Sequence, residues 1–212
     1  HRLGMLVDEV PYGDDVPWPE TADGDGPSLE LIHPDSDNTL AQNWKAGPAG
    51  GTPGQRNASW QDDPPPVVDQ LTHSPLTPGT ADTVTVTARV SDNLPPQAVR
   101  LNYRTITTDP FTQVTMFDDG AHGDGTASDG IYGGEIPALP QNSIVEFNVE
   151  ALDATGWSGR WPTGAPVRNA LYAVDGLAYS SANPIWRVVM TTTDLQTLKT
   201  RDVYSDVLLN CV

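Results

Sequence analysis

The fold is decided by residues 83–90, which read TVTVTARV. In an extended chain the valines and Ala88 fall on one face, and the threonines with Arg89 fall on the other. β-branched side chains favour a pleated strand. This stretch therefore predicts a half-buried strand with its valines directed into the core of a β-sandwich.

The same alternation of apolar and polar residues continues along the chain. It is found at residues 99–103, 114–116 and 145–151, and further short strands are predicted at residues 67–71, 131–136 and 165–170. These make about seven strands in roughly 105 residues, a spacing typical of sandwiches. The predicted fold class is all-β: an immunoglobulin-like or fibronectin-III-like β-sandwich flanked by partial β segments.

The prolines and glycines divide the chain into three segments. The run Asp62-Asp63-Pro64-Pro65-Pro66 favours an extended spacer and separates residues 1–62 from a sandwich at 63–170. The first segment has strand-like runs at 5–12 and 28–32 and a glycine-rich stretch, 47–54, interpreted as an irregular exit loop. In the run at 28–32, Leu29 and Leu31 are expected to face one way and Glu30 the other.

The last segment, residues 171–212, changes character again. Strands are predicted at 186–190 and 203–212, and a helical turn at 193–199 with Thr193 or Asp194 as its N-cap. Some 40 residues are too few for an independent core. The segment is therefore expected to dock on the sandwich or to begin a further domain.

Composition excludes several classes of function. The formal net charge is −17, which repels nucleic acid. No stretch reaches the roughly 20 apolar residues of a membrane span. The single cysteine, Cys211, allows no internal disulfide.

The chain starts at His1, which predicts a processed or shortened chain. The composition predicts an exported, extracellular or cell-surface bacterial protein.

The first segment resembles the C-terminal half of a bacterial lamin-tail domain. The matching residues are 6–10, 14–19, 22–32, 43–44 and 51–54. The resemblance implies a small immunoglobulin-like unit with an adhesive or surface-display role. Its first strands would precede His1.

The last segment resembles the opening of the spore-coat protein H (CotH) kinase-like family. The matching residues are 184–191, 194–195 and 204–210. The family's nucleotide-binding and catalytic residues lie beyond these entry strands. The resemblance therefore implies no kinase activity for this chain by itself, and it leaves an accessory role beside a kinase-like domain as an alternative.

The most distinctive motif is FDDGAHGDGTASDGIY at residues 117–132. Its four aspartates, Asp118, Asp119, Asp124 and Asp129, are separated by glycines that let the backbone curl. Such carboxylates can converge on calcium, which takes six to eight oxygen ligands. The alternative is turn chemistry, in which aspartate binds its own backbone and glycine supplies positive φ. The spacing is not that of an EF-hand.

Tryptophans raise a carbohydrate-binding alternative. Trp157 and Trp161 stand in turn-like surroundings, and exposed indole faces can stack on sugar rings. The competing interpretation is that they close the ends of a small sandwich. No motif indicates catalytic residues, and the four histidines are scattered.

The sequence thus predicts a non-catalytic structural, adhesion or assembly module of a larger secreted or surface protein, with calcium as a candidate cofactor. The expected partners are surface polymers or other copies of the chain. The incomplete ends could add strands to exposed sheet edges of neighbouring copies.

Overall fold

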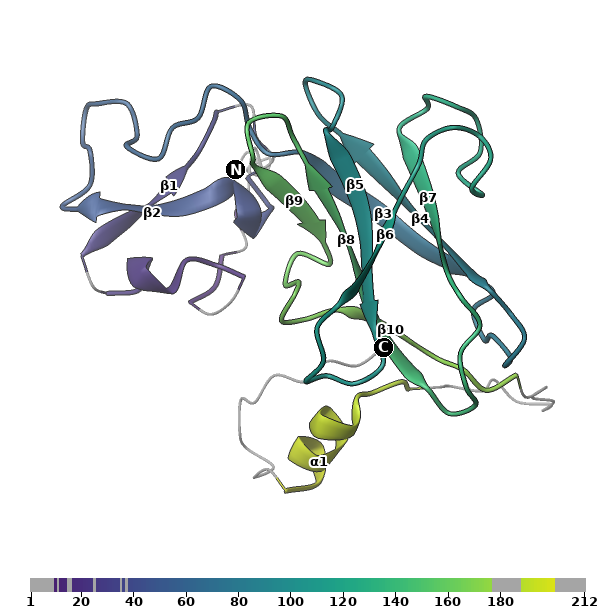
Figure 1. The fold of residues 1–212 in the computed structure, drawn as a ribbon. Helices are drawn as coiled ribbons and strands as arrows, with labels where there is room; N and C mark the ends of the chain where they lie inside the picture. The colour runs from purple at the N-terminus through teal and green to yellow at the C-terminus, as the bar shows by residue number, and fades with distance from the viewer. Residues whose placement is uncertain are drawn as a thin grey trace, which may run out of the picture. The chain divides into compact units, whose positions relative to one another are not determined.

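The computed structural model describes residues 10, 12–14, 17–24, 26–34, 36, 38–176 and 188–200. The chain divides into two compact units, His1–Pro65 and Pro66–Val212, and each is described by itself (Figure 1). Most of the strand predicted at 5–12, the start of the one at 186–190 and all of the one at 203–212 lie outside the described residues.

The first unit contains an antiparallel pair of strands. β1 (Pro27–Leu31) pairs with β2 (Trp44–Ala49), with Leu31 opposite Trp44 and a bulge between Pro27 and Leu29. Two short 3₁₀ turns, η1 (Glu20–Ala22) and η2 (Ala41–Asn43), precede the two strands. The strand predicted at 28–32 is therefore present.

The alternation predicted for β1 is present, with Leu29 and Leu31 in one state of burial and Glu30 in the other, whereas the irregular loop predicted at 47–54 is wrong for residues 47–49. Glu30 is 3% exposed, whereas Leu29 and Leu31 are only half-buried. Its carboxylate accepts hydrogen bonds from Thr52 Oγ1 at 3.1 Å and from the Ser59 N–H at 3.0 Å, so a distant loop folds over it. Gly47, expected in an irregular loop, lies within β2. A side chain at this position would collide with the Glu30 carboxylate, which explains why a glycine stands in the strand.

The second unit is built from eight strands in the part of the chain that the structure describes. They are β3 (Val67–Ser74), β4 (Val84–Ser91), β5 (Ala98–Arg104), β6 (Thr112–Thr115), β7 (Ile131–Ile136), β8 (Ile144–Leu152), β9 (Ser158–Trp161) and β10 (Ala170–Ala173).

All of these strands pair antiparallel and form two facing sheets (Figure 1). One sheet has the order β3-β4-β7, and the other has the order β10-β8-β5-β6, with β9 also paired to β8. The predicted all-β sandwich is confirmed. Sequence reading missed β9, and it expected the last strand at 165–170 rather than at 170–173.

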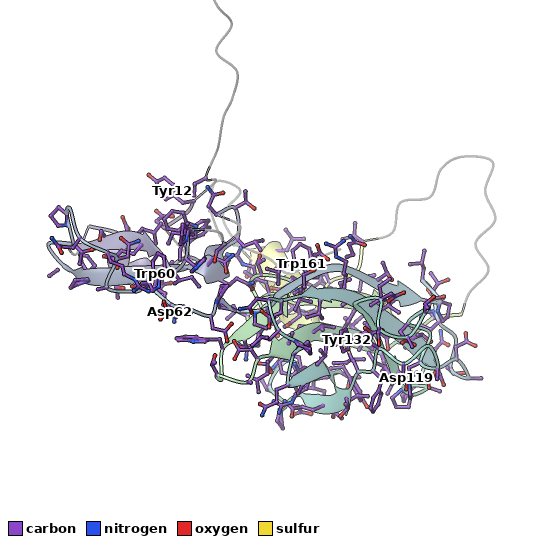
Figure 2. The ribbon with its side chains drawn as sticks, turned by 90° about the horizontal axis from the view of Figure 1, so that it is seen from above. Tyr12, Trp60, Asp62, Asp119, Tyr132 and Trp161 are labelled. Atoms are coloured by element: carbon purple, nitrogen blue, oxygen red, sulfur yellow. The ribbon has the colours of Figure 1, made fainter. Side chains whose placement is uncertain are left out.

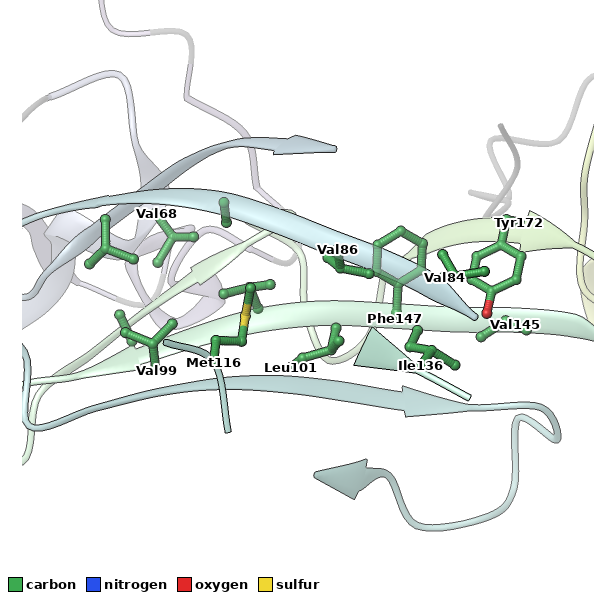
Figure 3. Close-up of a cluster of buried hydrophobic side chains, with 14 of the residues drawn as sticks. Val68, Val84, Val86, Val99, Leu101, Met116, Ile136, Val145, Phe147 and Tyr172 are labelled. Carbon is green, nitrogen blue, oxygen red and sulfur yellow. The ribbon is translucent and has the colours of Figure 1, made fainter. Parts of the chain in front are cut away.

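The core lies between these sheets, as the alternation predicted. Val84, Val86, Ala88 and Val90 of β4 are at most 7% exposed. They face the alternate apolar residues of β8 and β5, and Figure 3 shows these side chains meeting between the strands. Phe147 and Tyr172 lie together at one end of this core.

β8 is buried on both of its faces. Val145, Phe147 and Val149 point into the core, while Glu146 and Asn148 on the outer face are 3% and 1% exposed. The outer face of the five-stranded sheet therefore carries buried polar groups, which must find partners within the protein.

A single helix follows in the described residues, α1 (Thr192–Thr200). Its N-cap is Thr191, whose Oγ1 accepts the N–H of Asp194 at 3.0 Å and donates to the Asp194 carboxylate at 2.5 Å. The predicted cap at Thr193 or Asp194 is wrong by two or three positions, because a threonine run offers several equivalent candidates. Among the described helices, none has the length and apolar character needed to cross a membrane.

Candidate functional site

The aspartate-rich loop joins β6 to β7 and so crosses from one sheet to the other. Phe117 at its start pairs with Gly133 in β7, exchanging two backbone hydrogen bonds of 2.9 and 2.8 Å. Asp119 lies at the surface of this loop (Figure 2). The loop is anchored at both ends on regular strands.

Asp124 organises the first half of the loop. Its side chain is 1% exposed, and its carboxylate accepts backbone N–H groups from Asp119 and Gly120 at 2.7 Å and from His122 at 2.9 Å. These hydrogen bonds, with that of Gly120 the largest contribution, hold the pKa of Asp124 below its usual value. The buried Asp124 carboxylate thus fixes the conformation of the backbone that turns around it.

Two further aspartates fix the second half. The Asp118 carboxylate accepts the Gly130 N–H at 2.9 Å and the Asp129 N–H at 3.2 Å. Asp129 in turn accepts the N–H of Ile131 at 2.9 Å and of Thr126 at 3.2 Å. Both residues therefore satisfy backbone donors that have no partner in a sheet.

Asp119 has a different partner. Its Oδ1 lies 2.9 Å from His122 Nδ1 and also accepts the Ala121 N–H at 2.9 Å. The hydrogen bond with His122 lowers the pKa of Asp119, and the same bond raises the pKa of His122. The His122 ring also stacks on Phe117 with a centroid separation of 4.6 Å, so His122 contacts both an acidic and an aromatic side chain of the loop.

The loop was a candidate calcium site, and its carboxylates are directed mainly at backbone donors. Within the described ranges, no three histidine, cysteine or acidic side chains are grouped so that they could hold a metal ion. A cation would have to compete with N–H groups already bound to Asp118, Asp124 and Asp129. The arrangement corresponds to the turn-chemistry alternative, and calcium binding stays a prediction.

Close packing of glycines holds the loop against the sheet. A side chain at Gly133 would collide with the carbonyl oxygen of His122, and one at Gly123 would approach Thr85 Cγ2 at 2.7 Å. Gly123 also has φ of 76°, a conformation that favours glycine. These residues allow the loop backbone to lie directly on β4 and β7.

A second polar cluster, which sequence reasoning missed, lies on the outer face of β8. Glu146 accepts hydrogen bonds from Arg104 Nη2 at 2.8 Å, Thr107 Oγ1 at 2.6 Å and Asn169 Nδ2 at 3.1 Å. One carboxylate thus ties β8 to the loop after β5 and to the residue before β10. Glu150 makes a similar pair with Arg160 of β9.

Side-chain amides, all buried except that of Gln113, extend this cluster across the sheet. Gln113 donates to Asn102 at 3.1 Å, Asn102 to Asn148 at 3.0 Å, and Asn148 to Asn169 at 2.9 Å. Each amide therefore satisfies the next, from β6 to the segment before β10. The only sequence signal was a polar residue at every second position of β8, which is also the pattern of a solvated face.

The two candidate sugar-binding tryptophans have separate roles. Trp161 packs against the hydrophobic core from the end of β9, and its position is shown in Figure 2. Trp157 follows a turn organised by Asp153, whose Oδ1 accepts the N–H groups of Thr155 and Trp157 at 2.8 Å. Both side chains are half-buried. Sugar binding by this pair stays a prediction.

These features define an immunoglobulin-like β-sandwich with tightly fixed loops. Comparison with protein families agrees: residues 98–149 match the family model described as the second Ig-like domain of conditioned medium factor. The match covers β5, β6, β7 and most of β8. A comparison with curated proteins finds no match. The lamin-tail and CotH resemblances stay predictions.

Proposed function

We propose that this chain is a non-catalytic structural or adhesion module of a larger secreted or cell-surface protein. Its central domain is a sandwich of a kind that serves as a scaffold in many unrelated proteins, so the fold alone does not define the function. The proposal rests on how the domain uses its buried charged groups.

Those groups are engaged in fixing loops. Asp124 binds three backbone N–H groups of the β6–β7 loop, and Glu146 is held by arginine, threonine and asparagine side chains. A catalytic acid or base needs a carboxylate within reach of a substrate proton. Carboxylates whose oxygens are occupied by structural donors instead favour a rigid scaffold, and this observation carries the proposal.

Calcium in the β6–β7 loop is the alternative to turn chemistry alone, and comparison of the melting temperature with calcium and with chelator decides between the two. Surface polymers and other copies of the chain remain the proposed partners, because exposed sheet edges can pair with added strands.

The test combines turnover with binding. The full chain is immobilised and probed with purified cell-wall polysaccharides and with the chain itself, and in parallel it is incubated with ATP and generic protein acceptors. We expect binding to at least one of the first two partners, and no ATP turnover above that of a heat-denatured sample. Turnover that disappears on heating would contradict the proposal.

A further inference from the structure

The two sheets of the sandwich end in strands that are paired on one side only. β3 and β7 are the edges of the smaller sheet, and β6 lies at one edge of the larger sheet, opposite to β9 and β10. The backbone groups that an edge strand directs away from its sheet can bond to an added strand, and proteins usually block them. The way in which each edge is blocked therefore indicates where a partner strand can be added.

The edge of β7 is blocked by the loop that precedes it. The outward backbone groups of Gly133 are both bonded to Phe117, and the Ile131 N–H is bound by the Asp129 carboxylate at 2.9 Å. Glu135, two positions beyond Gly133, also directs its backbone outward and places a negative charge at the edge. A further strand would have to displace the loop or approach this charge.

The other two sides of the sandwich are protected in different ways. β3 has a bulge between Asp69 and Thr72, and bulges disrupt the pairing of an edge. The outward positions of β10 are Leu171 and Ala173, which are only 3% and 9% exposed and therefore covered. β9 is four residues long and has the charged Arg160 at an outward position.

β6 has none of these protections. Its sequence is TQVT, without charge, proline or glycine, and three of its four residues are exposed. The Met116 N–H bonds to the carbonyl of Val99, the residue directly opposite, at 2.9 Å. Because bonded and non-bonded pairs alternate along antiparallel strands, Gln113 and Asn102 form a non-bonded pair. The N–H and C=O of Gln113 therefore point away from β5.

This open edge is held in place from within the sandwich. The Gln113 side chain donates to Asn102 at 3.1 Å, at one end of the chain of amides on the outer face of the sheet. Val114, the next residue, packs against the hydrophobic core. The strand is thus fixed in an extended conformation, and an added strand would find its hydrogen-bonding groups already ordered.

A second copy of this chain is the partner that the edge of β6 fits best. Two chains of net charge −17 repel each other, so close contact is least unfavourable where the surface is uncharged. β6 is such a place, and its sequence is suited to pairing with itself. In an antiparallel pair with Gln113 at the two-fold axis, Thr112 of one copy lies opposite Val114 of the other, and such β-branched neighbours stabilise a sheet.

The residues on either side of β6 suit the same arrangement. Ile106, in the loop before β6, is 56% exposed, and Phe117, just after the strand, is 43% exposed. Antiparallel pairing brings the loop before one β6 to the end of the other. Each end of the pair would therefore gather exposed apolar side chains from both copies, which favours association.

We propose that β6 is a self-association edge, to which β6 of a second copy is added in antiparallel orientation so that the two larger sheets continue into one. This inference rests on the proposed function in one respect, since it selects another copy of the chain from the partners proposed there and assigns the strand that binds it.

The test is analytical ultracentrifugation of the full chain over about a hundredfold range of concentration, because small interfaces associate weakly. We expect the mass to rise from that of the monomer toward that of the dimer. The association should be stronger at high salt, because screening reduces the repulsion between two acidic chains. An acidic loop bound to a basic surface would show the opposite dependence on salt, and that result would overturn the proposal.

Two variants locate the interface. Gln113→Pro removes the outward N–H and no hydrogen bond to β5. It should weaken association about 10–100-fold, because each dimer loses two hydrogen bonds at roughly 3–10-fold each. Gln113→Glu places two like charges opposite each other and should also weaken association. The matched controls are Glu135→Pro, at an outward position of β7, and Gln97→Glu, at an exposed glutamine before β5. Both controls should keep the original association.

Backbone amide NMR spectra show whether each variant keeps the native fold. If Gln113→Pro does not, Gln113→Glu alone decides. The proposal is overturned if the chain stays monomeric at every concentration, or if natively folded Gln113 variants associate as strongly as the original chain. A monomer that still binds cell-wall polysaccharide without ATP turnover would overturn this inference and leave the proposed function standing. ATP turnover would contradict the proposed function whatever the state of association.

Discussion

Nη2 of Arg104 lies 2.8 Å from the carboxylate of Glu146, and only 15% and 4% of the two side chains are exposed. This ion pair is on the outer face of a sheet, a position usually open to water. It is buried because Thr107 and Asn169 close over the same carboxylate. The pair therefore connects three segments distant in the sequence.

Removing one partner of this pair should destabilise the sandwich strongly. In Glu146→Ala the Arg104 charge stays buried without its partner, and such a loss costs about 3–5 kcal/mol. The matched control is Asp69→Ala, which breaks a more exposed 3.5 Å pair with Arg89 and should cost about 0–1 kcal/mol. Urea unfolding followed by NMR signals of β4 and β8 measures both. Equal losses would show that the Glu146 pair is no more than a surface contact.

The β6–β7 loop should depend on Asp124 more than on its other aspartates. Asp124→Asn replaces a charged acceptor of three N–H groups by a neutral one, so the melting temperature should fall. Asp129→Asn, at an exposed position, should lower it less. Differential scanning calorimetry compares the two variants, and a larger effect of Asp129→Asn would contradict the role assigned to Asp124.

Calcium is tested on the same loop. Because its carboxylates already bind backbone N–H groups, we expect the melting temperature to be the same with calcium and with chelator. An ion at a hundred times its dissociation constant would instead stabilise the fold by about 2.7 kcal/mol. A higher melting temperature with calcium than with chelator, and no such difference in Asp124→Asn, would establish the calcium site predicted from the sequence.

The strands of the sandwich were predictable because their burial is encoded locally. The alternating valines of β4 are buried against β8 as expected. The outer face of β8 was not predictable, because Glu146 and Asn148 depend on Asn169, 23 and 21 positions away. A polar residue in a strand has the same local pattern whether water or another side chain satisfies it.

The candidate site was predictable in composition and less so in geometry. The sequence identified both Asp118 and Asp124 as candidate residues. Only the structure shows that Asp124 is the buried carboxylate around which the loop turns. The positive φ of Gln70 gave no sequence signal, since glutamine rarely adopts it. Gly47 was wrongly predicted to lie in a loop. In the sequence, a glycine required for close approach within β2 cannot be told from a glycine of a loop.

His73 should make stability depend on pH. Burial lowers its pKa below the usual value, although a hydrogen bond with the Leu76 backbone acts in the opposite direction. The unfolded chain then binds a proton more readily, so stability falls as the pH drops through about 6.5 toward the folded pKa. His73→Phe should remove this loss, as measured by urea unfolding between pH 7.5 and 5.

His122 provides the opposite sign on the same fold. Its pKa is raised by Asp119, so its contribution is complete below the unfolded value and is lost as the pH rises through the folded value. His122→Phe should therefore lower stability at acidic pH more than at neutral pH. If the two variants change the pH profile in the same direction, the assignment of at least one of the two histidines is wrong.

Gly133 should be the glycine of β7 that tolerates substitution least. A β-carbon there meets the backbone carbonyl of His122, which cannot move without displacing the loop that Asp124 holds in place. At Gly134, the next position along the strand, a β-carbon meets Met116 Cγ at 3.0 Å, the middle of a flexible side chain. Gly133→Ala should therefore cost about 1–3 kcal/mol or more, and Gly134→Ala clearly less. Urea unfolding gives the two losses, and amide shifts at residues 119–124 should change in Gly133→Ala alone. A Gly134→Ala loss equal to or above that of Gly133→Ala would mean that the loop does not rest on β7 in solution.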